Sequence, residues 1–543
     1  MSALRIALAQ LNFTVGDVSH NAEKMVATTK CAIENKADLI VFSELALTGY
    51  PIEDLLFRGK LHTQIQQAIE SILPHSQAID MLLGLPIKTD AGYHNAAIWL
   101  RKGKRLATFY KQKLPNYSVF DEWRYFLPRT EITSIDLKGQ RFGVLICEDL
   151  WHKEPIQQLV QAGAQSILCL NASPYSYLKS NLRAQILKTR TEEAHVPIFY
   201  VNQIGGQDEL VFDGDTQVID AQGNICAQAG WFEEKLLITD LSEKGEIVKQ
   251  SLITPLPKLE SIYNALVLGT RDYVLKNHFS GVLLGLSGGI DSALVLAIAV
   301  DALGPDRVTA ILMPSQYTAS MSNEEAIAEA KTLSVRYHTI PINTVYDAFI
   351  RQLKPVFKET KPDVTEENLQ ARIRGTLLMA LSNKMGALVL STSNKSEAAV
   401  GYSTLYGDMA GGFCPIKDVY KTIVYQLAHY RNQRSPIIPM RVIERPPSAE
   451  LAPNQKDEDT LPPYPILDQI LEQFVDQEKT VREIIDAGFD RDVVCKVAKM
   501  IQRNEYKRWQ AAPGIRITEK AFGKDWRYPV TSAFEESELT IED

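Results

Sequence analysis

Short apolar runs separated by longer stretches of mixed polarity organise the first half of this chain. Seven of these runs read as buried strands: residues 5–13, 37–44, 81–87, 94–100, 141–149, 165–173 and 197–203. Residues 21–35 carry apolar positions at helical spacing between the first two runs. Strands and helices mixed in this way predict a layered α/β or α+β domain.

The second half follows a different rhythm. Prolines in the segment 253–263 mark a linker, and a helix is predicted over about 258–277. Residues 281–304 then read as a strand, a glycine turn and a long helix. The run continues with a strand at 308–315, a helix at 323–335 and a strand at 387–394. This succession predicts a doubly wound parallel sheet, so we expect two domains, residues 1–255 and 256–543.

One segment departs from both patterns. Residues 435–464 carry seven of the 26 prolines in the chain, so this stretch cannot be regular structure throughout. An irregular segment of this length within a domain is either a linker or a mobile loop at an active site.

Composition excludes several classes of protein. The net charge of −8 leaves no overall basic surface for nucleic acid. Six cysteines with no CxxC pair argue against a disulfide scaffold and a structural zinc site. The longest apolar stretch is about eight residues, 293–300, whereas a membrane helix needs about 20. The N-terminus has no signal-peptide pattern, so we expect a cytoplasmic protein that does not bind membranes.

A glycine-rich loop in the second half has the features of a phosphate site. Residues 285–292 follow an apolar strand and begin a helix, where backbone N–H groups and the helix dipole favour an anion. The loop lacks the lysine of a Walker motif and carries Asp291, which would repel phosphate unless Mg²⁺ bridged the two. Glu397 follows another strand end, where α/β sheets bind ligands, and is expected to share the Mg²⁺ with Asp291.

Four motifs together resemble the NAD⁺ synthetases, which contain an ATP-pyrophosphatase loop: SGGIDSA (287–293), NLQARIRG (368–375), STSNKSE (391–397) and KDEDTLPPY (456–464). The resemblance implies a Rossmann-like ATP-pyrophosphatase fold that adenylates deamido-NAD⁺, after which ammonia displaces AMP. The ATP-binding residues that it implies are Leu286, Ser287, Gly288, Gly289, Ile290, Asp291, Ser292, Ala293 and Thr392. The deamido-NAD⁺ contacts that it implies are Asn368, Glu397 and Lys507. The proline-rich segment would then close over the adenylate, which water would otherwise hydrolyse.

A candidate nucleophile lies in the first half. Cys147 ends an apolar strand in GVLICEDLW, and Glu44 and Lys111 follow two other strands. Attack by a thiolate on an amide carbonyl needs a base and an oxyanion donor. Glu, Lys and Cys at three strand ends resemble the triad of the nitrilase superfamily, which implies an α-β-β-α sandwich. In that triad Glu44 takes the thiol proton, Lys111 stabilises the oxyanion and Cys147 carries the acyl group. Lys113 is the alternative to Lys111, whose spacing to Leu114 matches the lysine motif of the superfamily.

The segment LPNYSVFDEWRYF (114–126) is similar to a motif of glutamine-dependent NAD⁺ synthetases, with Ser118 in place of a glycine. This resemblance implies that Tyr117, Ser173 and Lys179 bind glutamine, and Glu148 is expected to face the substrate amine. It also implies a homo-oligomer in which ammonia released from L-glutamine passes inside the protein to the site that amidates deamido-NAD⁺.

Two alternatives stay open at this point. An amide ligase of the same loop class acting on another carboxylate would share SGGIDS but lack the NLQARIRG and KDEDTLPPY motifs. A nitrilase-fold binding protein with an inactive second half would lose Cys147, Lys111 or Asp291, and all three are present.

Overall fold

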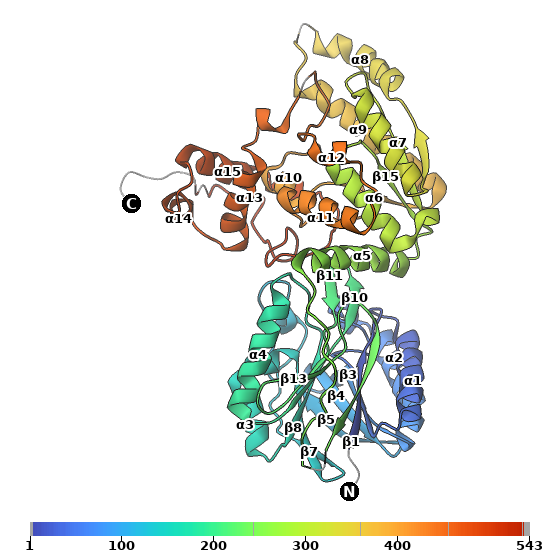
Figure 1. Ribbon diagram of the computed structural model, residues 1–543, viewed down its shortest axis with the longest axis vertical. Helices are drawn as coiled ribbons and strands as arrows, with labels where there is room; N and C mark the ends of the chain where they lie inside the picture. Colours follow the sequence, from blue (N-terminus) through green and yellow to red (C-terminus); the bar gives the residue numbers. More distant parts are fainter. Residues whose placement is uncertain (1–3, 243, 359, 454, 535, 537–543) are drawn as a thin grey trace. The chain divides into compact units, whose positions relative to one another are not determined.

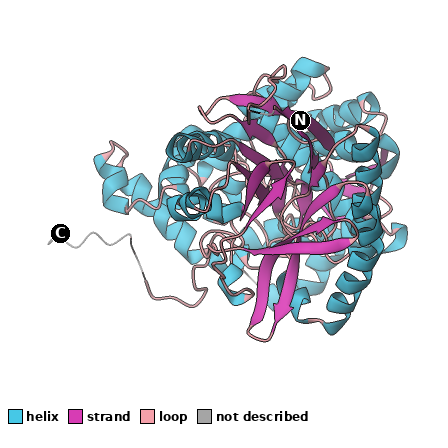
Figure 2. Ribbon diagram, turned by 90° about the horizontal axis from the view of Figure 1, so that it is seen from below, coloured by secondary structure: helices cyan, strands magenta, loops and turns pink. Residues whose placement is uncertain are grey.

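The computed structural model describes residues 4–242, 244–358, 360–453, 455–534 and 536. The chain divides into two units, Met1–Leu256 and Pro257–Asp543, and each unit has its own sheets (Figure 1). Helices flank the strands in both units (Figure 2).

The first unit contains two six-stranded sheets and a small hairpin. The first sheet has the order β14 (Lys235–Leu241), β1 (Leu4–Gln10), β2 (Leu39–Val41), β3 (Asp80–Thr89), β4 (Gly92–Arg101) and β5 (Lys104–Tyr110). The second has the order β13 (Ile225–Gln228), β12 (Gln217–Ile219), β9 (Ile198–Asn202), β8 (Ser166–Asn171), β7 (Gln140–Ile146) and β6 (Ser134–Leu137). The hairpin pairs β10 (Ile204–Gln207) with β11 (Leu210–Asp213).

Four helices cover this unit: α1 (Val18–Glu34), α2 (Gly59–Ile72), α3 (Lys153–Gln161) and α4 (Lys179–Ala194). Four 3₁₀ turns join the elements: η1 (Glu53–Phe57), η2 (Leu73–Gln77), η3 (Glu122–Arg124) and η4 (Cys147–Trp151).

Alternation along the strands builds the layers of the first unit. In β1, Ile6 and Leu8 pack in a core shared with Phe142 of the second sheet, whereas Ala7 packs in a core shared with Met25 of α1. The second sheet alternates in the same way between the shared core and a third cluster beneath α3 and α4. Figure 1 shows α1 and α2 on one side of the strands and α3 and α4 on the other. The result is the expected α-β-β-α sandwich.

The second unit is built on a four-stranded parallel sheet with the order β17 (Arg336–Thr339), β16 (Val308–Leu312), β15 (Val282–Gly285) and β18 (Leu388–Leu390). β15, β16 and β17 lie side by side in chain order, and β18 pairs with the other side of β15. Leu283 and Val389 pack against Leu378 of α9 (Val364–Met385) on one face. The strand order therefore reverses between β15 and β18, which is where doubly wound sheets bind ligands.

The remaining helices of the second unit surround the sheet and form a helical extension. They are α5 (Lys258–Lys276), α6 (Ile290–Leu303), α7 (Ser320–Thr332), α8 (Asn343–Phe357), α10 (Lys395–Val400), α11 (Lys421–Arg434), α12 (Met440–Glu444), α13 (Tyr464–Leu471), α14 (Val481–Asp486), α15 (Arg491–Arg503) and α16 (Glu505–Arg508). Short turns of other helix types are η5 (Pro305–Arg307), η6 (Asp457–Asp459) and η7 (Glu472–Asp476). A separate apolar cluster holds α10, α13, α14 and α15 together.

The predicted fold class is confirmed, and the differences concern element boundaries and short strands that were not predicted, such as β10 and β17. The helix predicted over 21–35 begins earlier, at Val18, because the Asp17 side chain accepts a hydrogen bond from the N–H of His20. The helix predicted over 323–335 spans 320–332, and Ser334 beyond its end has a left-handed φ of 57°. Among its described residues, the proline-rich segment 435–464 holds only α12 and η6 as regular structure before α13 begins. No helix among the described residues is long and apolar enough to cross a membrane.

A buried carboxyl in α7 gives a prediction about stability. Glu329 is 1% exposed, its Oε1 has no hydrogen-bond partner among the described residues, and burial raises its pKa to about 8 from the ordinary 4.5. Between these two pH values the unfolded chain releases a proton that the folded chain keeps. Stability therefore falls as pH rises, by up to about 1.4 kcal/mol per pH unit.

Glu329→Gln removes this dependence. The variant should gain free energy of unfolding over the unsubstituted protein between pH 5 and pH 8, as measured by urea unfolding. Glu324→Gln on the exposed side of the same helix is the control and should show no such gain. An equal difference at both pH values for Glu329→Gln would contradict the burial argument.

Candidate functional site

A buried lysine lies between two carboxylates at the end of β5. The Lys111 Nζ is 2.7 Å from Glu44 Oε1 and 2.8 Å from Glu122 Oε1. Burial by itself lowers the pKa of Lys111, yet the carboxylates of Glu122 and Glu44 raise that pKa well above its ordinary value. The ammonium is therefore charged. Lys113, the alternative at the sequence level, is a surface residue whose Nζ is 3.8 Å from Glu154.

Glu44 follows β2 and is held by three donors. Its Oε1 accepts hydrogen bonds from Asn95 Nδ2 at 2.7 Å and from Lys111, and its Oε2 accepts from the N–H of Ala172 at 3.0 Å. Ala172 directly follows β8 of the other sheet, so this carboxylate crosses from one sheet of the sandwich to the other. A side chain with this many partners and 1% exposure has one fixed orientation.

Cys147 begins η4 immediately after β7. Its φ is 45°, a left-handed conformation that costs a non-glycine residue roughly 1–2 kcal/mol. Burial raises the pKa of the thiol well above its ordinary value, the Glu44 charge adds to this shift, and Lys111 opposes it. The thiol is thus protonated at neutral pH, and it can act as a nucleophile only if a neighbouring base removes the proton as the bond forms.

The residues expected to bind glutamine lie around this turn. Glu148 directly follows Cys147 in the sequence, and its Oε2 accepts a hydrogen bond from the Tyr117 hydroxyl at 3.0 Å. Lys179 at the start of α4 places its Nζ 4.2 Å from the ring centre of Trp151, the last residue of η4. Ser173 follows Ala172, and its N–H donates to the Asn202 side chain at 2.9 Å.

The turn at Ser118 keeps a glycine-like conformation. Ser118 stands where the similar motif has glycine, and its φ is 53°. A serine tolerates this left-handed position at a modest cost, so the substitution leaves the turn in place.

Several residues of this site were missed at the sequence level. Glu122 lies in the quoted 114–126 motif, but a carboxylate at the start of a short 3₁₀ turn gives no local sign that it contacts a lysine eleven positions earlier. The Tyr50 hydroxyl donates to the same Glu122 oxygen at 2.9 Å. Burial raises the pKa of Glu122, although Lys111 opposes the shift. Asn95 and Asp149 were also missed, because an asparagine in a strand and an aspartate in a turn are common.

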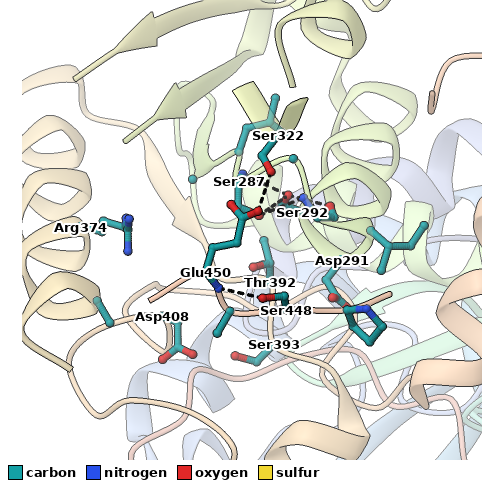
Figure 3. A pocket seen from close by; sticks show the side chains of 18 of the residues that line it. Ser287, Asp291, Ser292, Ser322, Arg374, Thr392, Ser393, Asp408, Ser448 and Glu450 are labelled. Carbon is teal, nitrogen blue, oxygen red and sulfur yellow. Dashed lines mark hydrogen bonds between the residues drawn. The ribbon is translucent and has the colours of Figure 1, made fainter. Parts of the chain in front are cut away.

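The second unit contains a cavity of about 280 Å³ at the carboxyl ends of β15 and β18 (Figure 3). Of the residues implied to bind ATP, Leu286 to Ser292 and Thr392 line it, and Ala293 is fully buried in α6. The proline-rich segment supplies another wall through residues 445–451. The Glu450 carboxylate accepts a hydrogen bond from Ser322 Oγ at 2.9 Å and pairs with Arg445.

The glycine loop has a fixed shape. The Ser292 hydroxyl accepts from the N–H of Ser287 at 3.2 Å and donates to the carbonyl of Gly289 at 3.0 Å. Gly288 has a φ of 81°, and a Cβ there would lie 2.2 Å from the carbonyl oxygen of Ser322. Only glycine fits this position, which brings the backbone and the N-terminus of α6 to the edge of the cavity.

A second buried lysine joins the two carboxylates predicted to share Mg²⁺. The Lys421 Nζ is 2.5 Å from Asp291 Oδ2 and 3.1 Å from Glu397 Oε1. Asn394 donates to Asp291 at 2.9 Å and accepts from the N–H of Glu397 at 3.0 Å. Burial lowers the pKa of Lys421, and the carboxylates of Asp291 and Glu397 more than reverse this shift. Lys421 was missed at the sequence level.

This arrangement bears on the metal prediction. Asp291 and Glu397 face one point, and hard carboxylate oxygens are what Mg²⁺ prefers. Among the described residues, no group of three or more His, Cys, Asp or Glu side chains is placed to hold a metal ion. The protein itself thus offers two carboxylates and a neutralising lysine.

Asn368 and Lys507 bind the segment beside the cavity. The Thr404 hydroxyl donates to Asn368 Oδ1 at 2.6 Å, and Lys507 Nζ donates to the carbonyls of Gly401 at 2.7 Å and Ser403 at 2.8 Å. Tyr402, Gly407 and Asp408 of this segment line the cavity. Asn368 and Lys507 therefore support its wall in this conformation.

Comparison with known proteins covers both units. A family model described as carbon-nitrogen hydrolase matches residues 5–247, and one described as NAD synthase matches residues 262–511. A glutamine-dependent NAD(+) synthetase from Acinetobacter baylyi is 47% identical over 540 residues, which are 98% of this chain and 99% of that protein.

Two solved structures extend the comparison. The glutamine-dependent NAD⁺ synthetase from Acinetobacter baumannii, solved with adenosine diphosphate, is 45% identical with a TM-score of 0.80 over 97% of this chain and 98% of its own. The glutamine-dependent NAD(+) synthetase from Cytophaga hutchinsonii is 21% identical with a TM-score of 0.86 over 98% of each chain, which bears on the fold alone.

Close packing behind Glu44 gives a prediction about the first unit. A Cβ at Gly84 of β3 would lie 2.5 Å from the N of Leu45 and 2.6 Å from the carbonyl oxygen of Ser43. Gly84→Ala must displace the backbone on both sides of Glu44, so it should lower the free energy of unfolding by about 1–3 kcal/mol. Guanidinium unfolding measures the loss. Gly59→Ala, where a Cβ meets nothing within 4 Å, is the control, and equal stability of the two variants would refute the crowding.

Proposed function

This chain belongs to the family of glutamine-dependent NAD(+) synthetases, and we propose that its two units divide the reaction between them. It is a carbon–nitrogen ligase that amidates deamido-NAD⁺ to NAD⁺ with nitrogen from glutamine, giving AMP, pyrophosphate and glutamate. The observation that carries the proposal is that one chain holds a buried Cys, Glu and Lys constellation in one unit and a glycine-loop cavity in the other.

In the first unit, Cys147 attacks the side-chain amide of glutamine. Glu44 takes the thiol proton as the carbon–sulfur bond forms, because the buried thiol is neutral at rest. The Lys111 ammonium stabilises the oxyanion of the tetrahedral intermediate. Glu44 then returns the proton to the amide nitrogen, so that ammonia leaves and a thioester remains. Water then hydrolyses the thioester to glutamate. The proposal is supported by the fixed positions of Glu44 and Lys111 and by the charge of the lysine.

We propose that side chains around η4 bind glutamine. We assign the α-amino group of glutamine to Glu148 and the rest of its polar contacts to Tyr117, Ser173 and Lys179. The pairing of Tyr117 with Glu148 and of Lys179 with Trp151 supports this assignment.

In the second unit, the carboxylate of deamido-NAD⁺ attacks the α-phosphorus of ATP and releases pyrophosphate. Ammonia then attacks the acyl carbon of the adenylate, and AMP leaves. The glycine loop, Ser287 and Ser292 bind phosphate oxygens, Thr392 contacts the adenine nucleotide, and Lys421 offsets the developing charge. We assign deamido-NAD⁺ to Asn368, Glu397 and Lys507, which requires Asn368 and Lys507 to exchange their present partners in the 401–404 segment for substrate.

Asp291 and Glu397 would hold Mg²⁺, which when bound neutralises charge on the ATP phosphates. In its absence the Lys421 ammonium, paired with both carboxylates, neutralises their charge. A homo-oligomer and a cytoplasmic location stay predictions; free cysteines at all six positions suit a reducing compartment. A ligase of the same loop class with another carboxylate substrate is disfavoured by the match of the whole chain to curated relatives.

The source of nitrogen is the first test. With amide-¹⁵N-glutamine, ATP and deamido-NAD⁺, the carboxamide of the NAD⁺ formed should carry ¹⁵N, as measured by mass spectrometry. Cys147→Ala should lose synthesis from glutamine but keep synthesis from added ammonium, because the second unit is untouched. NAD⁺ without ¹⁵N, or a Cys147→Ala variant inactive with ammonium, would show that the proposed division is wrong.

The glycine loop is the second test. Asp291→Asn removes one of the two charges that face Lys421, so synthesis from glutamine and from ammonium should both fall by at least about 10²-fold. Glutamate release by the first unit should remain measurable. Asp306→Asn at the exposed η5 turn is the control and should leave both activities unchanged. Selective loss of glutamate release in Asp291→Asn would overturn the assignment.

A further inference from the structure

Asp149 is a buried carboxylate that no step of the proposed chemistry uses. It lies two residues after Cys147 in η4 and is 1% exposed. Its Oδ1 accepts hydrogen bonds from the backbone N–H groups of Gln112 and Lys113, each at 2.8 Å. Its Oδ2 accepts from the backbone N–H of Ile146 at 3.1 Å. Three backbone donors from two parts of the chain therefore converge on one side chain.

These donors flank two members of the candidate triad. Gln112 and Lys113 directly follow Lys111 at the end of β5, and Ile146 directly precedes Cys147 at the end of β7. β5 and β7 belong to different sheets of the sandwich. The Asp149 carboxylate thus ties the chain after Lys111 to the chain before Cys147 across the boundary between the sheets.

We infer that Asp149 is a positioning residue that sets the placement of the Lys111 ammonium relative to the Cys147 thiol. The inference rests on the proposed glutaminase reaction. Asp149 acts through the backbone after Lys111 and before Cys147, whose N–H groups occupy both of its oxygens. Ile146 ends β7 and is buried, so its backbone N–H needs an acceptor, which Asp149 supplies.

The chemistry of the site favours a carboxylate. Two oxygens can accept three N–H donors, whereas an asparagine offers one oxygen and an NH₂ group that must face another donor. Leaving a buried N–H without an acceptor is costly, so a variant should shift the backbone to recover a partner. Such a shift moves Lys111 or Cys147, and a displacement of about 1 Å in a catalytic group can cost 10²-fold in rate.

The test compares full-length Asp149→Asn with the unsubstituted protein. Glutamate release from glutamine should lose on the order of 10²-fold in kcat, with KM for glutamine little changed, because the glutamine-binding side chains are untouched. Synthesis of NAD⁺ from ammonium should be unchanged, since it takes place in the other unit. Asp149→Ala should show the same split with a larger loss.

Asp220→Asn is the matched control. Asp220 accepts backbone N–H groups of Gln222 at 3.0 Å and Asn224 at 2.8 Å in a turn between β12 and β13, away from the triad. Its variant makes the same change from carboxylate to amide at an exposed turn and should keep the full kcat for glutamine.

The outcomes separate the inference from the function it rests on. If the unsubstituted protein releases no glutamate, the proposed function fails. If it does, a normal kcat in Asp149→Asn, or a rise in KM alone, overturns the positioning role. Thermal unfolding of Asp149→Asn and Asp149→Ala is followed by circular dichroism. If both lose the cooperative transition of the first unit, Asp149 is required for folding, and the positioning role is likewise overturned.

Discussion

A buried lysine held between two carboxylates is the constraint on which each site depends. Lys111 meets Glu44 and Glu122 in the first unit, and Lys421 meets Asp291 and Glu397 in the second. An unpaired charge costs several kcal/mol to bury, so these lysines can be interior only where the fold supplies both partners. In each unit the partners come from different elements, and the elements are therefore held in one arrangement.

In the first unit, the partners of the buried lysine come together where the ends of strands from the two sheets meet. Glu44 and Lys111 follow strands of one sheet, and Cys147 follows a strand of the other. Two carboxylates connect the sheets by hydrogen bonds. Glu44 accepts from the N–H of Ala172, and Asp149 accepts from backbone N–H groups next to the ends of β5 and β7. The apolar core between the sheets sets their spacing, and these hydrogen bonds link the segments that carry Glu44, Lys111 and Cys147.

The second unit combines a candidate site for nucleotide phosphates with a chain that is acidic overall. The net charge of −8 forbids attraction of nucleotides by the whole surface, so the positive field is local. A glycine loop at the start of α6 supplies backbone N–H groups, and Lys421 supplies a charge beside Asp291 and Glu397. The cavity lies between the ends of β15 and β18, at the point where the strand order reverses.

The sequence by itself determined which segments are buried strands, where the glycine loop lies and which cysteine stands at a strand end. These features are local. Apolar runs indicate buried segments, and Gly288 indicates a place where the backbone has no space for a side chain. Only the tertiary structure decided the partners of the lysines. Glu122 and Asn95 are ordinary polar residues in sequence, and Lys421 is 130 positions from Asp291. Short or polar strands such as β10 and β17 also escaped prediction. Their place depends on neighbouring strands, and the pairing of distant polar groups leaves no periodic trace along the chain.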